Sequence, residues 1–186
     1  MNAQILNCNA KRYIQNPLSP KFPMKKYVFL DRDGVLNKKR NDYVKSPLEL
    51  EILPKIHLDL KRLIEHNFEL IIITNQSLIN RGIITIEQEE TINQKLLDFL
   101  QKNHIPIKKI YICPHRPDEN CNCRKPKTGL IDKAVNDFDI DLSSTWFIGD
   151  SDTDRQAAQN SGCNFLLNET NGDISELVDF ILKNSK

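Results

Sequence analysis

Paired carboxylates follow a short apolar segment near the start of the chain. Asp31 and Asp33 come directly after Tyr27-Val28-Phe29-Leu30, and Asp150 and Asp154 follow another apolar segment much later. Two carboxylates one residue apart repel each other, and holding them close is costly unless a nearby positive charge offsets that repulsion. A divalent cation, most simply Mg²⁺, would supply that charge, because it prefers carboxylate oxygens and keeps waters for a substrate phosphate.

Basic and hydroxyl side chains could complete such a site. Arg124 and Lys125 would supply mobile positive charge, and Thr74 ends a third apolar segment. Taken singly, an Asp-x-Asp is more often a solvated turn, Thr74 a turn cap and Lys125 a surface charge. Their joint occurrence at segment ends favours phosphoryl transfer, in which catalysis consists mainly of positioning and charge neutralisation.

Four metal-ligating side chains lie close together in the middle of the sequence. Cys113, His115, Cys121 and Cys123 are separated by one, five and one residues. This pattern predicts a closed Cys₃His zinc site of structural type, and an incidental group of cysteines is the disfavoured alternative. Zinc would pin the loop that leads into Arg124 and Lys125. Cys163 is predicted to be a small core residue.

Apolar segments alternate with amphipathic ones along the chain, which predicts an α/β fold with a Rossmann-like, mostly parallel sheet and helices on both faces. In an open parallel sheet the carboxyl ends of the strands share one edge, so the polar groups that follow them should converge there. The predicted strands are 27–30, 70–73, 109–112, 145–148 and 165–167. The predicted helices begin near 54, 85, 129, 152 and 173, the second with the capping box Thr85-Ile86-Glu87-Gln88.

Length and composition restrict the remaining possibilities. The chain has 186 residues with a formal net charge of +1, which indicates one domain and no nucleic-acid or membrane-surface partner. Residues 26–186 are predicted to form that domain, and residues 1–25, with three prolines, an extended or loosely attached segment. The early residues lack the apolar stretch of a secretory signal, so we expect a cytoplasmic protein, and nothing in the composition suggests more than a monomer.

Four motifs together resemble those of the haloacid dehalogenase (HAD) phosphatase superfamily. They are Asp31-Arg32-Asp33-Gly34-Val35-Leu36-Asn37, Thr74-Asn75-Gln76-Ser77, Cys-Arg-Lys-Pro at 123–126, and Gly149-Asp150 with Asp154. Within the superfamily the sequence is most similar to D-glycero-D-manno-heptose 1,7-bisphosphate 7-phosphatases and to the related histidinol-phosphate phosphatase domains. The resemblance extends over residues 26–170 and includes the zinc loop.

The resemblance implies a role for each motif. Asp31 would be the nucleophile that forms an aspartyl-phosphate, and Asp33 the acid that protonates the leaving oxygen and then activates water. Thr74 would hydrogen-bond the transferring phosphoryl group and Lys125 would neutralise it. Mg²⁺ would be held by the Asp31 side chain, the Asp33 main-chain carbonyl and Asp150, with Asp154 in support.

The predicted substrate is a phosphorylated sugar. The segment between Asn37 and Pro54 is too short for a large cap domain, so residues 38–43 would form only a flap beside the nucleophile. Asp42 and Tyr43 in this flap, together with Asn75, Gln76, Ser77 and Arg124, are the predicted substrate contacts. The resemblance implies removal of the 7-phosphate of heptose 1,7-bisphosphate in nucleotide-heptose synthesis for lipopolysaccharide or a surface glycan.

Three alternatives compete with this prediction. Histidinol-phosphate hydrolysis shares the zinc loop and differs in substrate alone, and Leu78-Ile79-Asn80 departs from the Gly-Ile-Ala usual in heptose bisphosphatases. A 3′-phosphatase acting on nucleic acid ends is disfavoured by the balanced charge. A catalytically silent, zinc-stabilised module that binds a phosphorylated ligand is disfavoured because the whole set of carboxylates, Thr74 and Lys125 is present.

Overall fold

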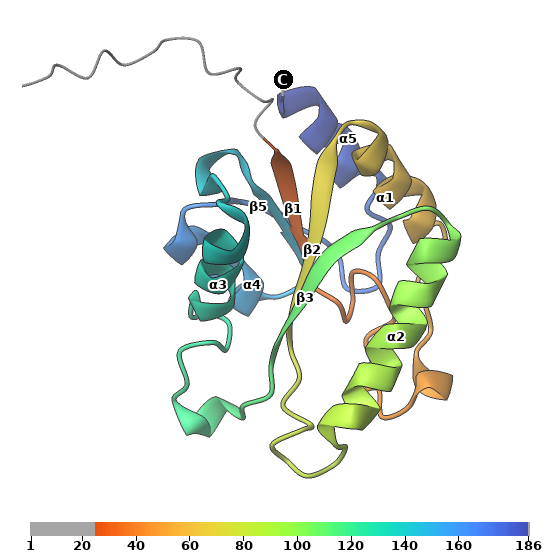
Figure 1. The fold of residues 1–186 in the computed structure, drawn as a ribbon, viewed down its shortest axis with the longest axis vertical. Coiled ribbons are helices and arrows are strands. Elements are labelled where there is room, and N and C mark those ends of the chain that lie inside the picture. The colour runs from red at the N-terminus through yellow and green to blue at the C-terminus, as the bar shows by residue number, and fades with distance from the viewer. Residues whose placement is uncertain (1–24, 186) are drawn as a thin grey trace, which may run out of the picture.

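The computed structural model describes residues 25–185, which form five strands and five α-helices in alternation (Figure 1). The predicted N-terminal segment, residues 1–25, lies outside the described residues except for Lys25. Among the residues described, no helix is long and apolar enough to cross a membrane.

The strands form one sheet in the order β3-β2-β1-β4-β5, and every pairing is parallel, as the sequence predicts. The central strands are short apolar runs that are covered on both faces, which is the usual environment of a parallel strand. Their bounds are β1 Lys26–Leu30, β2 Phe68–Asn75, β3 Ile107–Cys113, β4 Trp146–Gly149 and β5 Asn164–Leu167.

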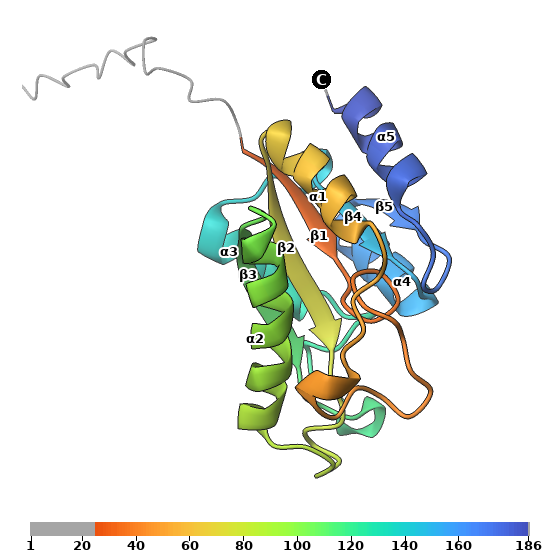
Figure 2. The same ribbon diagram turned by 90° about the vertical axis from the view of Figure 1, so that its right-hand side faces the viewer.

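Helices cover both faces of the sheet, in agreement with the prediction (Figures 1 and 2). Alternate strand residues point to opposite faces, so Leu30 and Phe29 belong to two separate cores. The core around Leu30 is closed by α1 (Ile56–Glu65), α2 (Ile86–Lys102) and α5 (Ser175–Asn184). The core around Phe29 is closed by α3 (Gly129–Phe138) and α4 (Asp152–Ser161), and it includes the buried Cys163.

Some boundaries differ from the sequence prediction. Strand β2 runs on to Asn75, so Thr74 and Asn75 are its last residues and do not lie beyond its end. The reason is that β3 pairs with β2 through Asn75 and keeps the backbone extended. Helix α5 begins at Ser175, while Asp173 accepts a hydrogen bond from the Ser175 amide at 2.7 Å. The capping box of α2 is confirmed.

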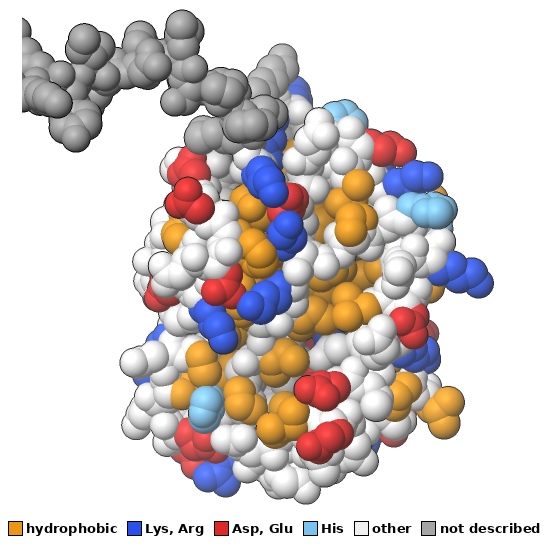
Figure 3. Space-filling model, viewed as in Figure 1, with side chains coloured by type: hydrophobic (Ala, Val, Ile, Leu, Met, Phe, Trp, Pro, Cys, Tyr) orange, Lys and Arg blue, Asp and Glu red, His pale blue; other side chains and the backbone are white. Residues whose placement is uncertain are grey.

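Charged side chains protect the outer strand of the sheet. Lys108 and Lys109 of β3 are exposed and pair with Glu69 and Asp137, respectively. Basic side chains on an outer strand discourage pairing with a further strand. Figure 3 shows the same mixture over this face of the molecule, where basic and acidic side chains lie among apolar ones.

Candidate active site

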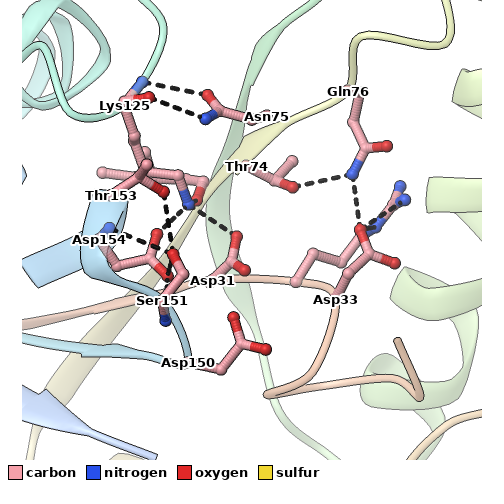
Figure 4. Close-up of polar contacts among 12 residues, drawn as sticks. Asp31, Asp33, Thr74, Asn75, Gln76, Lys125, Asp150, Ser151, Thr153 and Asp154 are labelled. Atoms are coloured by element: carbon pink, nitrogen blue, oxygen red, sulfur yellow. Dashed lines mark hydrogen bonds and ion pairs between the residues drawn. The ribbon is translucent and has the colours of Figure 1, made fainter. Parts of the chain in front are cut away.

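Three neighbouring strands bring the predicted site residues to one edge of the sheet. In the register of the sheet, Leu30 of β1 lies opposite Ile72 of β2 and Ile148 of β4. Asp31 therefore lies close to Thr74 at the end of β2 and to Asp150 after β4, as expected for carboxyl ends of parallel strands. Figure 4 shows these side chains converging, although they are far apart in the sequence.

A cavity of about 210 Å³ opens at this edge. Most of the predicted catalytic and substrate-binding residues line it, and the flap and the start of α4 contribute further polar side chains. Its predicted lining residues are Asp31, Asp33, Tyr43, Thr74, Asn75, Gln76, Arg124, Lys125, Asp150 and Asp154. Its other lining residues are Lys39, Arg40, Val44, Ser151 and Thr153.

Lys125 is fixed between two carboxylates, which corrects the prediction that its charge is mobile. Its Nζ lies 2.7 Å from Asp31 Oδ1 and 2.6 Å from Asp154 Oδ1, and it also donates to the Ile73 carbonyl. The side chain is only 3% exposed, so these partners take the place of solvent around the ammonium. Burial raises the pKa of Asp31 well above its usual range, although the Lys125 charge opposes that rise.

The Lys125 backbone is also tied to the sheet. The Asn75 side chain accepts a hydrogen bond from the Lys125 amide at 3.1 Å and donates one to the Lys125 carbonyl at 3.2 Å. This pair of bonds joins the end of β2 to the loop that carries the basic residues (Figure 4). Asn75 therefore positions the loop in addition to lining the cavity.

Asp33 is held from three directions. Its Oδ1 accepts from Asn37 Nδ2 at 2.9 Å, and its Oδ2 accepts from Gln76 Nε2 at 2.7 Å and from Arg32 Nε at 3.1 Å. Burial acts to raise the pKa of Asp33, but the Arg32 charge and the hydrogen bonds from Asn37 and Gln76 together lower it below its usual value. Gln76 also donates to Thr74 Oγ1 at 2.8 Å, so the two strand ends share one network.

A glycine makes the close approach of the two carboxylate loops possible. Gly34 has φ +96°, in the left-handed region that side chains other than glycine rarely adopt. A Cβ atom at this position would overlap Asp150 Oδ2. The Asp-x-Asp-Gly turn therefore needs glycine both for its backbone and for the carboxylate packed against it.

The carboxylates fit a hard divalent cation. One oxygen from each of Asp31, Asp150 and Asp154 lies within 4.8 Å of the others. Asp154 Oδ1 is buried 2.6 Å from Lys125 Nζ, and Asp154 Oδ2 accepts a hydrogen bond from Ser151 Oγ, so both oxygens of Asp154 already have partners. Lys39 Nζ lies 2.8 Å from Asp150 Oδ2. Carboxylate oxygens gathered in this way suit Mg²⁺ and its preference for oxygen ligands.

The Cys/His cluster has the dimensions of a tetrahedral metal site. Cys123 Sγ lies 3.3 Å from Cys113 Sγ and 3.5 Å from Cys121 Sγ, and His115 Nδ1 lies 3.2 Å from Cys123 Sγ. A disulfide would bring two sulfurs to about 2.05 Å. Zn–S bonds of about 2.3 Å imply a tetrahedron edge of roughly 3.8 Å. The four side chains thus fit one zinc ion better than any disulfide.

Two predicted substrate contacts lie outside the cavity lining. Asp42 is exposed and pairs with Lys45 and Arg40, which lower its pKa to about 2 and hold it on the outside of the flap. Ser77 is buried behind Gln76, where its Oγ accepts a hydrogen bond from Arg81 Nε at 3.4 Å. Substrate contacts of these two residues stay predictions.

Several lining residues were absent from the sequence prediction. Ser151 is the N-cap of α4, and its Oγ donates to Asp154 Oδ2 at 2.6 Å. The Ser-x-x-Asp capping spacing was the signal that could have identified it. Lys39 and Arg40 belong to the predicted flap, but no spacing rule shows which flap side chains turn inward.

Comparison with known proteins agrees with this geometry. Residues 122–177 match a family described as HAD-hydrolase-like. A protein of Thermoplasma volcanium named probable D-glycero-D-manno-heptose-1,7-bisphosphate 7-phosphatase is 42% identical over 125 residues, which cover 67% of this chain and 85% of that protein. The chain belongs to the heptose-bisphosphate phosphatase family of HAD-like hydrolases.

A solved member of this family has the same fold. The crystal structure of D,D-heptose 1,7-bisphosphate phosphatase from Bordetella bronchiseptica, complexed with magnesium and phosphate, superposes with a TM-score of 0.79 at 31% identity. The match covers 85% of this chain and 98% of that one. The histidine biosynthesis bifunctional protein HisB of Legionella pneumophila is 35% identical over 77% of this chain, but the match covers only 41% of HisB.

Proposed function

We propose that this chain is a Mg²⁺-dependent phosphatase that removes the 7-phosphate of D-glycero-D-manno-heptose 1,7-bisphosphate. The observation that carries the proposal is the arrangement of Asp31, Lys125 and Asp33 at one cavity. A carboxylate paired with a buried ammonium lies beside a second carboxylate held by three donors. The names of the heptose-bisphosphatase relatives support the choice of substrate.

Asp31 and Asp33 divide the reaction between them. An Asp31 oxygen attacks phosphorus, the ester P–O bond breaks, and a proton passes from Asp33 to the leaving sugar oxygen. In the second half, Asp33 takes a proton from water, the water oxygen attacks the aspartyl-phosphate, and the Asp31–phosphorus bond breaks. An anionic phosphoryl group beside Asp33 raises its pKa, which favours the protonated form needed in the first half.

The other residues of the site neutralise the charge of the phosphoryl group and position the substrate. Lys125 and Thr74 stabilise the charge of the transferring phosphoryl group. Mg²⁺ would be held by the carboxylates of Asp31 and Asp150 and by the Asp33 main-chain carbonyl, with Asp154 in support, and it would add positive charge at the phosphoryl oxygens. Lys39, Arg40 and Arg124 line the same cavity and suit a substrate with a second anionic group.

The proposed zinc site would position part of this machinery. Cys113, His115, Cys121 and Cys123 would form a closed, structural site. Arg124 Nη1 donates to the His115 carbonyl at 3.0 Å, and Lys125 follows directly. Zinc would therefore fix the loop from which two basic side chains reach the cavity.

A second candidate substrate is histidinol phosphate, which the similarity to HisB supports. Both reactions would use the same nucleophile and acid, so kcat/KM on the two substrates separates them. We expect a preference of at least about a hundredfold, or 2.7 kcal/mol, for one heptose anomer. A preference for histidinol phosphate would overturn the substrate and leave the chemistry unchanged.

The chemistry is tested by Asp31→Asn, measured as phosphate released in the presence of Mg²⁺. The amide cannot act as the nucleophile, so we expect a loss of at least about a thousandfold without a change in circular dichroism. Asp98→Asn is the matched control, because Asp98 is an exposed carboxylate of α2 outside the cavity, and it should retain near wild-type activity. Residual activity of Asp31→Asn above about a tenth of wild type would refute a catalytic Asp31.

A further inference from the structure

Behind Asp33, a buried group of polar side chains connects the active site to α2. We propose that Glu89 and Asn93 are positioning residues for the acid Asp33 and that they act through the guanidinium of Arg32. This inference deepens the proposed function and depends on the assigned role of Asp33. Neither α2 residue lines the cavity.

The guanidinium of Arg32 contacts Asp33 on one side and the two α2 residues on the other. Its Nε and Nη2 lie 3.1 and 3.0 Å from Asp33 Oδ2, while its Nη1 lies 2.5 Å from Glu89 Oε1 and 2.9 Å from Asn93 Oδ1. Asn93 Nδ2 also donates to Glu89 Oε1 at 3.0 Å. Because the guanidinium is a rigid plane, contacts on its far side also restrict the edge that faces Asp33.

Burying the Arg32–Glu89 ion pair removes two charges from water, which costs free energy. The side chains of Arg32 and Glu89 are each only 1% exposed, whereas Asp33 is 23% exposed and faces the cavity. An apolar pair of similar volume would stabilise a core as well as a buried ion pair, and often better. Glu89 Oε2 has no hydrogen-bond partner among the described residues, so the carboxylate is engaged through one oxygen, toward Arg32 and Asn93.

The arrangement determines which part of Asp33 is free to exchange a proton. Asp33 Oδ2 is occupied by Arg32 and Gln76, so the carboxylate cannot rotate without breaking both contacts. Oδ1 has one side-chain donor, Asn37, so it is the oxygen of this cavity-lining residue with acceptor capacity left. Without Glu89 the guanidinium loses its far anchor, and a small displacement of Asp33 is enough to slow proton transfer.

The test is Glu89→Gln, which keeps the shape of the side chain and removes its charge. We compare kcat/KM for heptose bisphosphate with that for 4-nitrophenyl phosphate. The sugar alkoxide needs a proton in order to leave and the nitrophenolate does not, so we expect about a tenfold loss on the sugar and a change within about twofold on the aryl ester. A purely structural defect would slow both reactions equally.

Lys95→Met is the matched control on the same helix. Lys95 Nζ donates to the carbonyls of Pro47 and Leu50 and is not among the partners of the Arg32 guanidinium, so this variant should change kcat/KM for both substrates by the same factor. Asn93→Ala keeps both charges and removes one acceptor of Arg32, and it should shift the two substrates in the same direction as Glu89→Gln by a smaller factor. It serves as the test if Glu89→Gln does not fold.

Equal losses on both substrates, or no loss on either, would overturn the positioning role. Asp33→Asn separates this failure from a failure of the proposed function. If Asp33→Asn shows the selective loss on the sugar and Glu89→Gln does not, only the positioning role of the α2 residues is wrong. If Asp33→Asn itself leaves the sugar reaction unchanged, the acid has been assigned to the wrong residue.

Discussion

At the residue scale, Lys125 satisfies a structural and a chemical requirement together. Its ammonium separates Asp31 from Asp154, which would otherwise be two buried carboxylates with no positive charge between them. The same ammonium faces the cavity in which phosphate would bind. Burial lowers and the two carboxylates raise the pKa of Lys125, and the carboxylates prevail. The surrounding carboxylates therefore favour the charged form of Lys125.

Lys125→Met should expose this double role. Removing one partner of a buried ion pair costs about 3–5 kcal/mol, so the free energy of unfolding without Mg²⁺ should fall by that amount. Mg²⁺ should recover more stability in the variant than in the wild type, because it supplies the missing charge. Urea unfolding with and without Mg²⁺ measures both effects. Equal stabilisation of the two proteins by Mg²⁺ would contradict this account.

Three of the residues that sequence alone could predict share one property. Asp31, Thr74 and Asp150 lie at strand ends, and parallel topology brings strand ends together whatever the loops do. Glu89 carried a weaker signal: the helical period that turns Ile92 and Leu96 inward also turns Glu89 inward. A buried acid needs a cationic partner. The identity of that partner depends on how α2 packs against the turn after β1, which no local pattern encodes.

At the element scale, α2 begins with a complete capping box. Thr85 Oγ1 accepts from the Gln88 amide at 3.2 Å, and Gln88 Oε1 accepts from the Thr85 amide at 2.8 Å. These bonds satisfy donors that the first turn of a helix leaves free. The cap lies one turn before Glu89, so it defines where the helix starts without contacting the active site.

Thr85→Ala should lower the free energy of unfolding by about 1 kcal/mol, because the side-chain acceptor is lost. We expect kcat/KM to remain within about twofold of wild type, since local fraying at an exposed helix end leaves the Glu89 contacts intact. Thr91→Ala is the matched control: its hydroxyl donates to the Gln88 carbonyl within the same helix. A loss as large in Thr91→Ala as in Thr85→Ala would show that capping is not the cause.

At the scale of the whole molecule, the Cys/His loop connects the two layers of the fold. Cys113 ends β3 and packs in the core around Phe29, while Gly129 begins α3 directly after the loop. A Cβ atom on Gly129 would overlap the Asn122 carbonyl, so the helix start is packed tightly on the loop. Loosening the loop should therefore affect both global stability and the basic residues at the cavity.

Cys121→Ser tests this coupling with the whole protein. Serine is a poor zinc ligand, so zinc content measured by elemental analysis should fall and the free energy of unfolding should drop by more than about 1 kcal/mol. A loss of 1 kcal/mol lowers the Tm of a chain of this size by about 2–4 °C. Because Arg124 is tied to the His115 carbonyl, KM should rise more than kcat falls.

Cys163→Ser is the matched control, since Cys163 is a buried thiol outside the cluster and should leave zinc content unchanged. Unchanged zinc in Cys121→Ser would remove Cys121 from the ligand set, and lost zinc with an unchanged KM would show that the loop does not position Arg124.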